Sequence, residues 1–351
     1  MSGKRYLVII NQLLFLFTAY LTGCVEEVRV PIRTIEPQLV VEGHISNDGP
    51  PYTVRLTRSG SFNEPGSSES SAITEAQVYI LETSTNQRLH LLPVDEQPGL
   101  YQSGDSTFVA RVGQSYQVRI ELPEEKVFVS EPETMPEAVP VESLTARFTG
   151  NTGNVLDTPF GYDIFLNTQD QPGQRNYYRW TANSIIRREA IGVRDFGGVF
   201  HKKFCWTPVD DNEIIIYADS YSDGQPIREQ YLYRSPVYIV GKHFVEVQQY
   251  SLTREAYQYW RRFNEQRQRV GTIFDPIPSP VYGNVYNQAD PTERALGLFE
   301  VAGVSQKRLV VPGDTLNDAL LKVQTLRYVI PGDCRYVFYK GSEVPPQNWL
   351  P

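Results

Sequence analysis

The chain has 351 residues, a net charge of -8 and a hydrophobic fraction of 40%. This hydrophobic fraction excludes a globally disordered chain, and the acidic balance argues against a nucleic-acid backbone as partner. Twenty-two tyrosines, with 25 glycines and 25 prolines against two methionines, favour strands and turns over helices. The length is sufficient for two domains of ordinary size.

Residues 1–23 have the pattern of a bacterial lipoprotein signal peptide. A short basic region at Lys4 and Arg5 is followed by an apolar stretch, and the segment Leu21–Cys24 places small residues before its cysteine. We expect cleavage before Cys24 and lipidation of Cys24 with acyl chains such as palmitate. Two or more chains anchor a protein stably, because each buried methylene contributes ~0.8 kcal/mol.

Two other interpretations of this segment are a membrane-spanning helix and an apolar first strand. A spanning helix needs ~20 apolar residues. The stretch barely reaches that length, contains Asn11 and Gln12, and is followed by acidic rather than basic residues. Residues 24–36 are then a lipid-anchored tether. Glu26 and Glu27 resemble the acidic surface-export signal of Bacteroidota lipoproteins, or they are simply a solvated part of the tether.

Residues 37–135 are predicted to form a small β-sandwich. Six short runs alternate in polarity or are rich in β-branched and aromatic residues, and turn residues separate them. In one run Tyr52, Val54 and Leu56 fall on one face, which is typical of a half-buried antiparallel strand. This spacing predicts a sandwich of the immunoglobulin-like or prealbumin-like kind. The six runs are 38–45, 52–58, 76–82, 99–103, 115–122 and 126–130.

Two segments of loop composition interrupt the predicted strands. Residues 59–74 are rich in serine, glycine and proline, too polar to pack and long enough to move. In residues 131–144, Pro132, Pro136 and Pro140 favour an extended connector. We place the boundary between the two predicted domains in this connector.

Residues 136–351 are predicted to form a larger antiparallel β domain with one amphipathic helix, residues 253–270. Thr253 can cap the first turn, and Leu252 can contact Tyr257. The apolar stripe consists of Ala256, Trp260, Phe263 and Val270, and the opposite face of Arg254, Arg261, Arg262 and Arg269. This arginine face either contacts phosphate or carboxylate groups of a partner or is simply solvated. The β-type runs are 143–148, 162–167, 176–188, 200–206, 213–218, 230–240 and 242–252.

No catalytic template fits the sequence. The zinc motif HExxH, the GxSxG elbow and the glycine-rich phosphate loops are missing from it. After Cys24 only Cys205 and Cys334 remain, and in an oxidising compartment they most economically form a disulfide, with a Cys205 nucleophile as the alternative. Asp219 and Asp223 have the spacing of a calcium loop, but the other ligand positions do not fit, so we interpret the segment as a turn. We therefore predict no catalytic residue, cofactor or metal.

Aromatic residues gather in the second half of the chain. They are either ordinary strand packing or a contact surface for a glycan, a peptide or a partner protein. The loop residues 63–71, the arginine face of the predicted helix and the segment 283–290 are further candidate contacts. The residues that we select as ligand or partner contacts are Tyr221, Tyr233, Arg261, Arg262, Tyr282, Asn284 and Tyr286.

Short motifs spread over nearly the whole mature chain carry a family resemblance. They include LVVEGHI, PPYTVRLTRS, NYYRW, VEVQQYSLTREAYQYW, FDPIPSPVYGNVYNQAD and ALGLFEVAGV. This set is similar to the domain of unknown function 4249 family, a group of Bacteroidota envelope lipoproteins, although a second cysteine expected beside Cys334 is missing. The resemblance implies a tethered, mostly β lipoprotein that accompanies a TonB-dependent outer-membrane transporter.

We therefore expect an outer-membrane lipoprotein that is exposed at the cell surface and anchored in the lipid bilayer through acylated Cys24. Its expected role is that of a non-enzymatic binding or accessory module of a TonB-dependent transporter. An independent glycan- or peptide-binding lipoprotein is the first alternative. A hydrolase whose site is assembled only on folding is the second.

Overall fold

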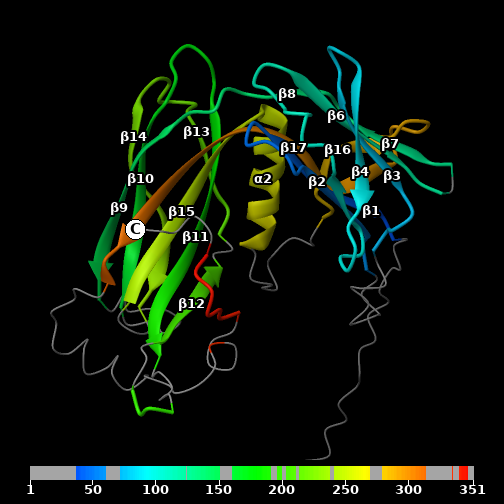
Figure 1. Ribbon diagram of the computed structural model, residues 1–351. Coiled ribbons are helices and arrows are strands. Elements are labelled where there is room, and N and C mark those ends of the chain that lie inside the picture. Colours follow the sequence, from blue (N-terminus) through cyan, green and yellow to red (C-terminus); the bar gives the residue numbers. More distant parts are fainter. Residues whose placement is uncertain are drawn as a thin grey trace, which may run out of the picture. The chain divides into compact units, whose positions relative to one another are not determined.

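Among the residues that this computed structural model describes, strands make up almost all of the regular structure, together with one α-helix (Figure 1). This confirms the prediction of a mainly β protein. The predicted signal peptide, Cys24 and the tether up to residue 36 lie outside the described residues, as does the loop segment 61–71. The structure describes residues 37–60, 72–123, 125–150, 160–190, 196–199, 203–210, 213–237, 241–268, 279–313, 334 and 340–346.

Nine strands close into a barrel, so each of them has hydrogen-bonded neighbours on both sides. Strand β17 pairs in parallel with β1, where Val40 faces Leu296. Strand β16 pairs with β7, where Val285 faces Ser130, and thereby joins the other end of the sheet. The strands in order are β1 (Leu39–Ser46), β2 (Thr53–Arg58), β5 (Leu100–Ser103), β4 (Gln87–Pro93), β3 (Gln77–Glu82), β6 (Ser115–Glu121), β7 (Val127–Ser130), β16 (Tyr282–Asn287) and β17 (Arg294–Val311).

The closed barrel corrects the predicted sandwich of residues 37–135. All six predicted strands are present, but β16 and β17 cover the two edges that a sandwich would leave open. Both closing strands lie far along the chain from β1 and β7, and their local sequence pattern does not predict these partners. The prediction also misses β4, and the short β8 (Glu133–Thr134) pairs with β6. The predicted ranges 37–135 and 136–351 therefore share one sheet.

Apolar side chains at alternate strand positions fill the barrel. In β2, Val54 and Leu56 are fully buried and their neighbours along the strand are half-buried, as the alternation predicts. Buried tyrosines keep partners for their hydroxyl groups. The Tyr52 hydroxyl accepts from the Ala110 N–H at 2.8 Å, and the Tyr101 hydroxyl accepts from the Ala76 N–H at 3.0 Å. The tyrosines thus contribute apolar area without leaving a buried polar atom unpaired.

Strand β17 continues past the barrel into a second sheet. Its last ten residues pair with β15 (Gly241–Leu252), beginning where Ala302 faces Leu252. The sheet then extends from β15 to β11 (Tyr177–Ala190), which pairs with both β12 (Lys203–Asp210) and β13 (Ile215–Ala218). One strand of 18 residues is therefore common to the barrel and to this sheet.

A separate three-stranded sheet shares a core with the second sheet. Apolar residues from both sheets form one cluster around Tyr178 and Trp180, which are fully buried. The indole N–H of Trp180 donates to the side-chain oxygen of Gln249 at 2.8 Å. The strands of this sheet, in order, are β14 (Pro226–Pro236), β10 (Gly161–Gln169) and β9 (Val141–Thr149).

The helix α2 (Arg254–Arg267) begins at the cap that the sequence predicts. The Thr253 hydroxyl accepts from the Ala256 N–H at 3.1 Å, which satisfies one free donor of the first turn. Ala256 and Tyr259 are buried, and together with Leu252 they pack against apolar residues of β17. The end of the predicted helix, including Arg269 and Val270, lies outside the described residues. Within the described residues, no helix has both the length and the apolar character needed to cross a membrane.

The proline-rich connector is packed against the second sheet. Val139 is buried, and its carbonyl oxygen accepts from Gln249 Nε2 at 2.7 Å and from the Ser305 hydroxyl at 2.6 Å. The connector also crosses β17 at Gly303, where a Cβ atom would lie 2.4 Å from the carbonyl oxygen of Pro136. The connector is therefore fixed by hydrogen bonds at the point where the chain leaves the barrel strands.

This close approach predicts that Gly303→Ala destabilises the protein. The methyl group must displace the connector backbone, and such overpacking costs about 1–3 kcal/mol. Urea unfolding followed by tryptophan fluorescence measures the loss. Gly104→Ala is the matched control, because the nearest atom to its added Cβ is Leu92 Cδ1 at 3.9 Å. Equal unfolding midpoints for the two variants would contradict the packing of the connector on β17.

Candidate functional site

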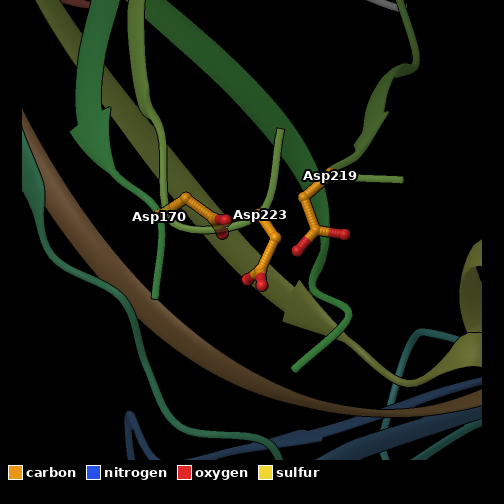
Figure 2. A group of neighbouring side chains, drawn as sticks. All are labelled: Asp170, Asp219 and Asp223. Carbon is orange, nitrogen blue, oxygen red and sulfur yellow. The ribbon is translucent and has the colours of Figure 1, made fainter. Parts of the chain in front are cut away.

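Three aspartates converge where β10, β11, β13 and β14 meet their connecting loops (Figure 2). Asp170 directly follows β10, Asp219 directly follows β13, and Asp223 lies in the turn that leads to β14. One carboxylate oxygen of each lies within 4.8 Å of the others. Asp170 and Asp219 are buried, whereas Asp223 is exposed. We call these three residues the aspartate cluster.

Backbone N–H groups donate to every member of the aspartate cluster. The Gly224 N–H donates to Asp170 Oδ2 at 2.8 Å, and the Asn176 N–H donates to Asp219 Oδ2 at 2.9 Å. In the same direction as the Asn176 bond, the Gly173 N–H donates to Asp223 Oδ1 at 2.9 Å. The carboxylates thus tie the loop 170–176 to the turn 219–225.

The electrostatics of the aspartate cluster follow from burial and mutual repulsion. Burial raises the pKa of Asp219, the Asn176 N–H lowers it, and the neighbouring Asp170 and Asp223 raise it. The Tyr178 hydroxyl donates to Asp170 Oδ1 at 2.6 Å, and burial together with this carboxylate raises the pKa of Tyr178. Such an arrangement can hold a hard cation such as Ca²⁺, which binds carboxylate and carbonyl oxygens. Its hydrogen bonds equally well explain it as a clamp between two loops.

The sequence identifies only part of this arrangement. Asp219 and Asp223 are singled out by their calcium-loop spacing, but Asp170 lies far away along the chain and is brought in by the pairing of β10 with β14. Gly224 has a φ of +68°, a conformation that favours glycine. The sequence interpretation of residues 219–225 as a turn agrees with the hydrogen bonds from Ser222 N–H to the Asp219 carbonyl and from Gln225 N–H to the Ser222 carbonyl.

A second polar cluster is buried beside α2, centred on Glu300 of β17. Glu300 is 3% exposed, and its Oε1 accepts from Arg179 Nη2 at 2.5 Å. The indole N–H of Trp260 in α2 donates to Glu300 Oε2. The Arg179 guanidinium lies 3.9 Å from the centre of the Tyr250 ring and 4.6 Å from that of Trp260. His44 of β1 completes the cluster, with Nε2 4.0 Å from Glu300 Oε1.

Opposing effects fix the charges in this buried cluster. Burial opposes ionisation of Glu300, but the Arg179 charge and the hydrogen bonds from Arg179 and Trp260 together hold its pKa below the usual value. Burial lowers the pKa of His44 in spite of the Glu300 carboxylate. The result is an ionised Arg179–Glu300 pair beside a neutral imidazole at neutral pH. Sequence patterns give no signal for this pair, whose members are 121 residues apart.

The structure distinguishes among the candidate contact residues. Arg261 and Arg262 lie on the solvent face of α2, and Tyr221 is fully exposed, 104% by relative area. Tyr282 and Tyr286 of β16 are half-buried. These five side chains remain available at the surface.

Tyr233 and Asn284 are corrections to the predicted contacts. Tyr233 is 3% exposed and packs in the core between the two sheets, because it lies on the inward side of β14. Asn284 is 5% exposed; its Nδ2 donates to Glu133 Oε1 and to the carbonyl oxygen of Phe299, each at 2.8 Å. Both side chains are committed to internal contacts and cannot also bind a partner at the surface.

Cys205 and Cys334 form a disulfide. Both residues are fully buried, and the adjacent Trp206 exchanges two backbone hydrogen bonds with Ser342. The bridge therefore fastens the C-terminal part of the chain to strand β12. In the chain-entropy account, closing a loop of 129 residues contributes ~4 to 5 kcal/mol to stability. A nucleophilic role for Cys205, the alternative considered from the sequence, does not fit a disulfide-bonded sulfur.

A serine and a histidine lie within hydrogen-bonding distance of each other in the core, although no sequence motif predicts this contact. The Ser235 hydroxyl lies 2.7 Å from His243 Nδ1, and the Ser184 hydroxyl is 3.2 Å from that of Ser235. A serine beside a histidine is the basic element of a hydrolase site. Here, however, Ser235 and His243 are both 0% exposed. The contact therefore fills the core of the second half and offers no surface to a substrate.

Family comparison assigns the chain over most of its length. The family model described as a domain of unknown function (DUF4249) matches residues 25–308. The chain belongs to this family. The matched DUF4249 region includes the barrel, α2, the aspartate cluster and the buried Glu300 cluster. The resemblance drawn from short motifs is thus confirmed at the level of the family.

Other comparisons add little to this DUF4249 assignment. No curated protein matches the chain. Among solved structures, the chicken interferon gamma receptor alpha chain is similar with 11% identity, covering 62% of this chain and 91% of that chain, with a TM-score of 0.18. A score this low supports no inference about fold or function.

For the aspartate cluster, we predict a strong coupling between Asp170 and Tyr178. A buried hydrogen bond to a charged group contributes about 1.5–3 kcal/mol. A double-mutant cycle of Asp170→Ala, Tyr178→Phe and the double variant should therefore give a coupling energy in this range. Chemical unfolding at pH 7 measures the free energies of unfolding, and additive losses of this free energy would contradict the clamp.

A calcium titration tests the alternative that the aspartate cluster holds a cation. In that case millimolar CaCl₂ would raise the melting temperature of wild type but not that of Asp223→Asn.

For the buried Glu300 cluster, we predict that Glu300→Ala destabilises the protein by about 3–5 kcal/mol, because it leaves the Arg179 charge buried and uncompensated. Urea unfolding provides the measurement. Glu142→Ala is the control, since its ion pair with Arg228 is exposed and such pairs contribute at most ~1 kcal/mol. Similar losses in the two variants would contradict a buried Arg179 charge that depends on Glu300 for compensation.

Proposed function

We propose that this DUF4249 chain is a lipoprotein of the outer membrane, exposed at the cell surface, that works as a non-enzymatic binding or accessory module. The observation that carries this proposal is the segment Leu21–Cys24 behind an apolar stretch, because it ends at the cysteine that becomes lipidated in such signals. Glu26 and Glu27, which begin two residues after Cys24, support surface export. Residues 24–36 then serve as the tether between the acylated Cys24 and the folded β structure.

The partner that we propose is a TonB-dependent transporter of the outer membrane. The support is the family resemblance, which implies a lipoprotein that accompanies such a transporter. An acidic chain with a net charge of -8 is poorly suited to an anionic nucleic acid. A protein partner also suits the location, since lipid anchoring confines both molecules to one membrane and raises their effective concentration.

The contact surface that we propose is the solvent face of α2, with Arg254, Arg261 and Arg262. Arginine forms bidentate hydrogen bonds with carboxylates, so an acidic patch on the partner fits this face. The ion pair between Arg261 Nε and Glu265 Oε1, 3.6 Å long with both side chains more than half exposed, contributes at most ~1 kcal/mol. A carboxylate of the partner can therefore replace Glu265 at little cost.

The inner face of α2 is fixed, so the arginines are presented on a rigid support. Ala256 and Tyr259 are buried, Trp260 donates to Glu300, and the Thr253 hydroxyl donates to Glu133 Oε2 at 2.7 Å. Rigid presentation reduces the entropy that association must overcome. This separates α2 from an ordinary solvated helix that lacks such internal anchors.

A second candidate function is independent capture of a glycan or peptide. The fully exposed Tyr221 favours it, because a free aromatic ring at a turn can stack on an apolar sugar face or a peptide side chain. Tyr286 is less free: burial and the neighbouring Glu131 raise its pKa. The two candidates differ in whether binding needs the transporter.

We predict that the lipidated protein, purified in detergent from its native host by affinity capture, retains an outer-membrane transporter in stoichiometric amount. Arg261→Glu with Arg262→Glu should reduce the recovered transporter at least tenfold, because two attractive contacts become repulsive. Quantitative mass spectrometry of the eluate is the measurement. Arg88→Glu with Arg111→Glu is the control, as it makes the same change of charge at two exposed arginines elsewhere.

Recovery of the wild-type protein alone, in good yield, would contradict the accessory role and favour independent ligand binding. Glycan and peptide arrays probed with wild type and with Tyr221→Ala would then test that binding. Equal recovery of the transporter with both double variants would keep the partner but remove α2 as the contact surface. Cys24→Ala tests the anchor separately, since the protein should then leave the membrane fraction.

A further inference from the structure

Glu133 is a buried carboxyl group that joins three segments distant in sequence. It lies in β8 and is 5% exposed. Its Oε2 accepts from the hydroxyl of Thr253, the capping residue of α2, at 2.7 Å, and its Oε1 accepts from Asn284 Nδ2 of β16 at 2.8 Å. One side chain therefore fastens the beginning of α2 to both β8 and β16.

Glu133 lacks a cationic partner among the described residues. Its two hydrogen-bond donors, the Thr253 hydroxyl and the Asn284 amide, are neutral. The charged groups that face it are Glu255 in the first turn of α2 and Glu300 on β17, and both are acidic. Burial, with a smaller contribution from these two carboxylates, raises the pKa of Glu133 to about 7, although its two hydrogen bonds lower it.

Glu300, which is also buried and contacts α2 at Trp260, behaves in the opposite way. Arg179 stabilises its charge, and the Trp260 indole donates to it. Two buried carboxyl groups thus hold the same helix, one at its cap and one at its middle. Only the group at the cap changes its charge near neutral pH.

We propose that Glu133 is a proton-operated latch that holds the first turn of α2 to β8 and to the barrel strand β16. While its carboxyl group is protonated, both hydrogen bonds are made without burying a charge. When the proton leaves, a negative charge remains beside Glu255 and Glu300, and water must enter to solvate it. This water competes for the Thr253 hydroxyl, which also caps α2 by accepting from the Ala256 N–H.

The direction of the pH effect follows from proton linkage. Below about pH 4.5 Glu133 is protonated in both the folded and the unfolded chain. Between about pH 4.5 and 7 the folded chain keeps a proton that the unfolded chain has lost, so this contribution to stability declines as the pH rises. Above about pH 7 the contribution is gone, and the latch is open.

The test compares full-length wild type with Glu133→Gln and Glu137→Gln by urea unfolding at pH 5.5 and 8.5. Glutamine copies the protonated carboxyl group, since its oxygen accepts from Asn284 and its amide faces a hydroxyl that can also accept. Glu137 lies in the same connector and is exposed, so Glu137→Gln is the matched control. For wild type and for the control, we divide the unfolding equilibrium constant by that of Glu133→Gln at the same pH. This ratio should be about 30-fold larger at pH 8.5 than at pH 5.5.

Hydrogen exchange locates the effect in α2. At pH 8.5 the amides of residues 254–260 should exchange faster in wild type than in Glu133→Gln, and at pH 5.5 they should exchange equally. In wild type alone, the ratio of the exchange rate of this segment to that of residues 243–250 of β15 should increase with pH. This comparison does not depend on the folding of any variant. Parallel stability profiles for all three proteins, or a constant exchange ratio in wild type, would overturn the latch.

Discussion

The backbone hydrogen bonds of β17 are shared between two sheets, and most of the structure depends on this sharing. Over residues 296–302 the strand pairs with β1 and closes the barrel, and over residues 302–311 it pairs with β15 and forms the centre of the second sheet. A continuous strand cannot shift in one sheet without shifting in the other, because a slip of one residue would turn every side chain to the opposite face. The barrel and the second sheet are therefore held in one register rather than joined by a flexible linker.

A buried ion pair and a close backbone crossing lie near the point where β17 passes between the sheets. Glu300 lies two residues before this point and Gly303 one residue after it. A buried ion pair is rarely a better source of stability than apolar packing of the same volume. The Arg179–Glu300 pair instead fixes orientation, since it connects β11 with β17, while Trp260 adds α2 and the connector crosses at Gly303. The pair thus specifies how β11 lies against β17, and this is its contribution in return for removing the two charges from water.

This rigid junction gives the proposed function a physical basis. An anchored protein that must find a partner in the same membrane benefits from a recognition surface that does not reorganise on binding. The tether is proposed for residues 24–36, and α2 supplies the fixed surface because its inner side is committed to Glu133, Glu300 and apolar residues of β17. If Glu133 responds to protons as we propose, acidity near the membrane adjusts how firmly that surface is held.

The sequence alone determined the local structure of this protein. Alternating polarity identified most of the strands, and Thr253 correctly marked the beginning of α2, because strand alternation and helix caps depend on neighbouring residues. The short motifs of the sequence also carried the family resemblance, which the DUF4249 match confirms at the family level. The lipidation of Cys24 that we propose likewise rests on the sequence alone. None of these conclusions required contacts between distant segments.

The tertiary structure decided what depends on distant partners. Alternation shows which residues share a face, but not what covers that face, so it could not reveal that Tyr233 and Asn284 are buried. It likewise could not pair β1 with β17, add Asp170 to Asp219 and Asp223, or bring Arg179 to Glu300. The pairing of strands far apart in sequence is set by the packing of the whole chain, and closure of the barrel removed the free edges that the local pattern had led us to expect.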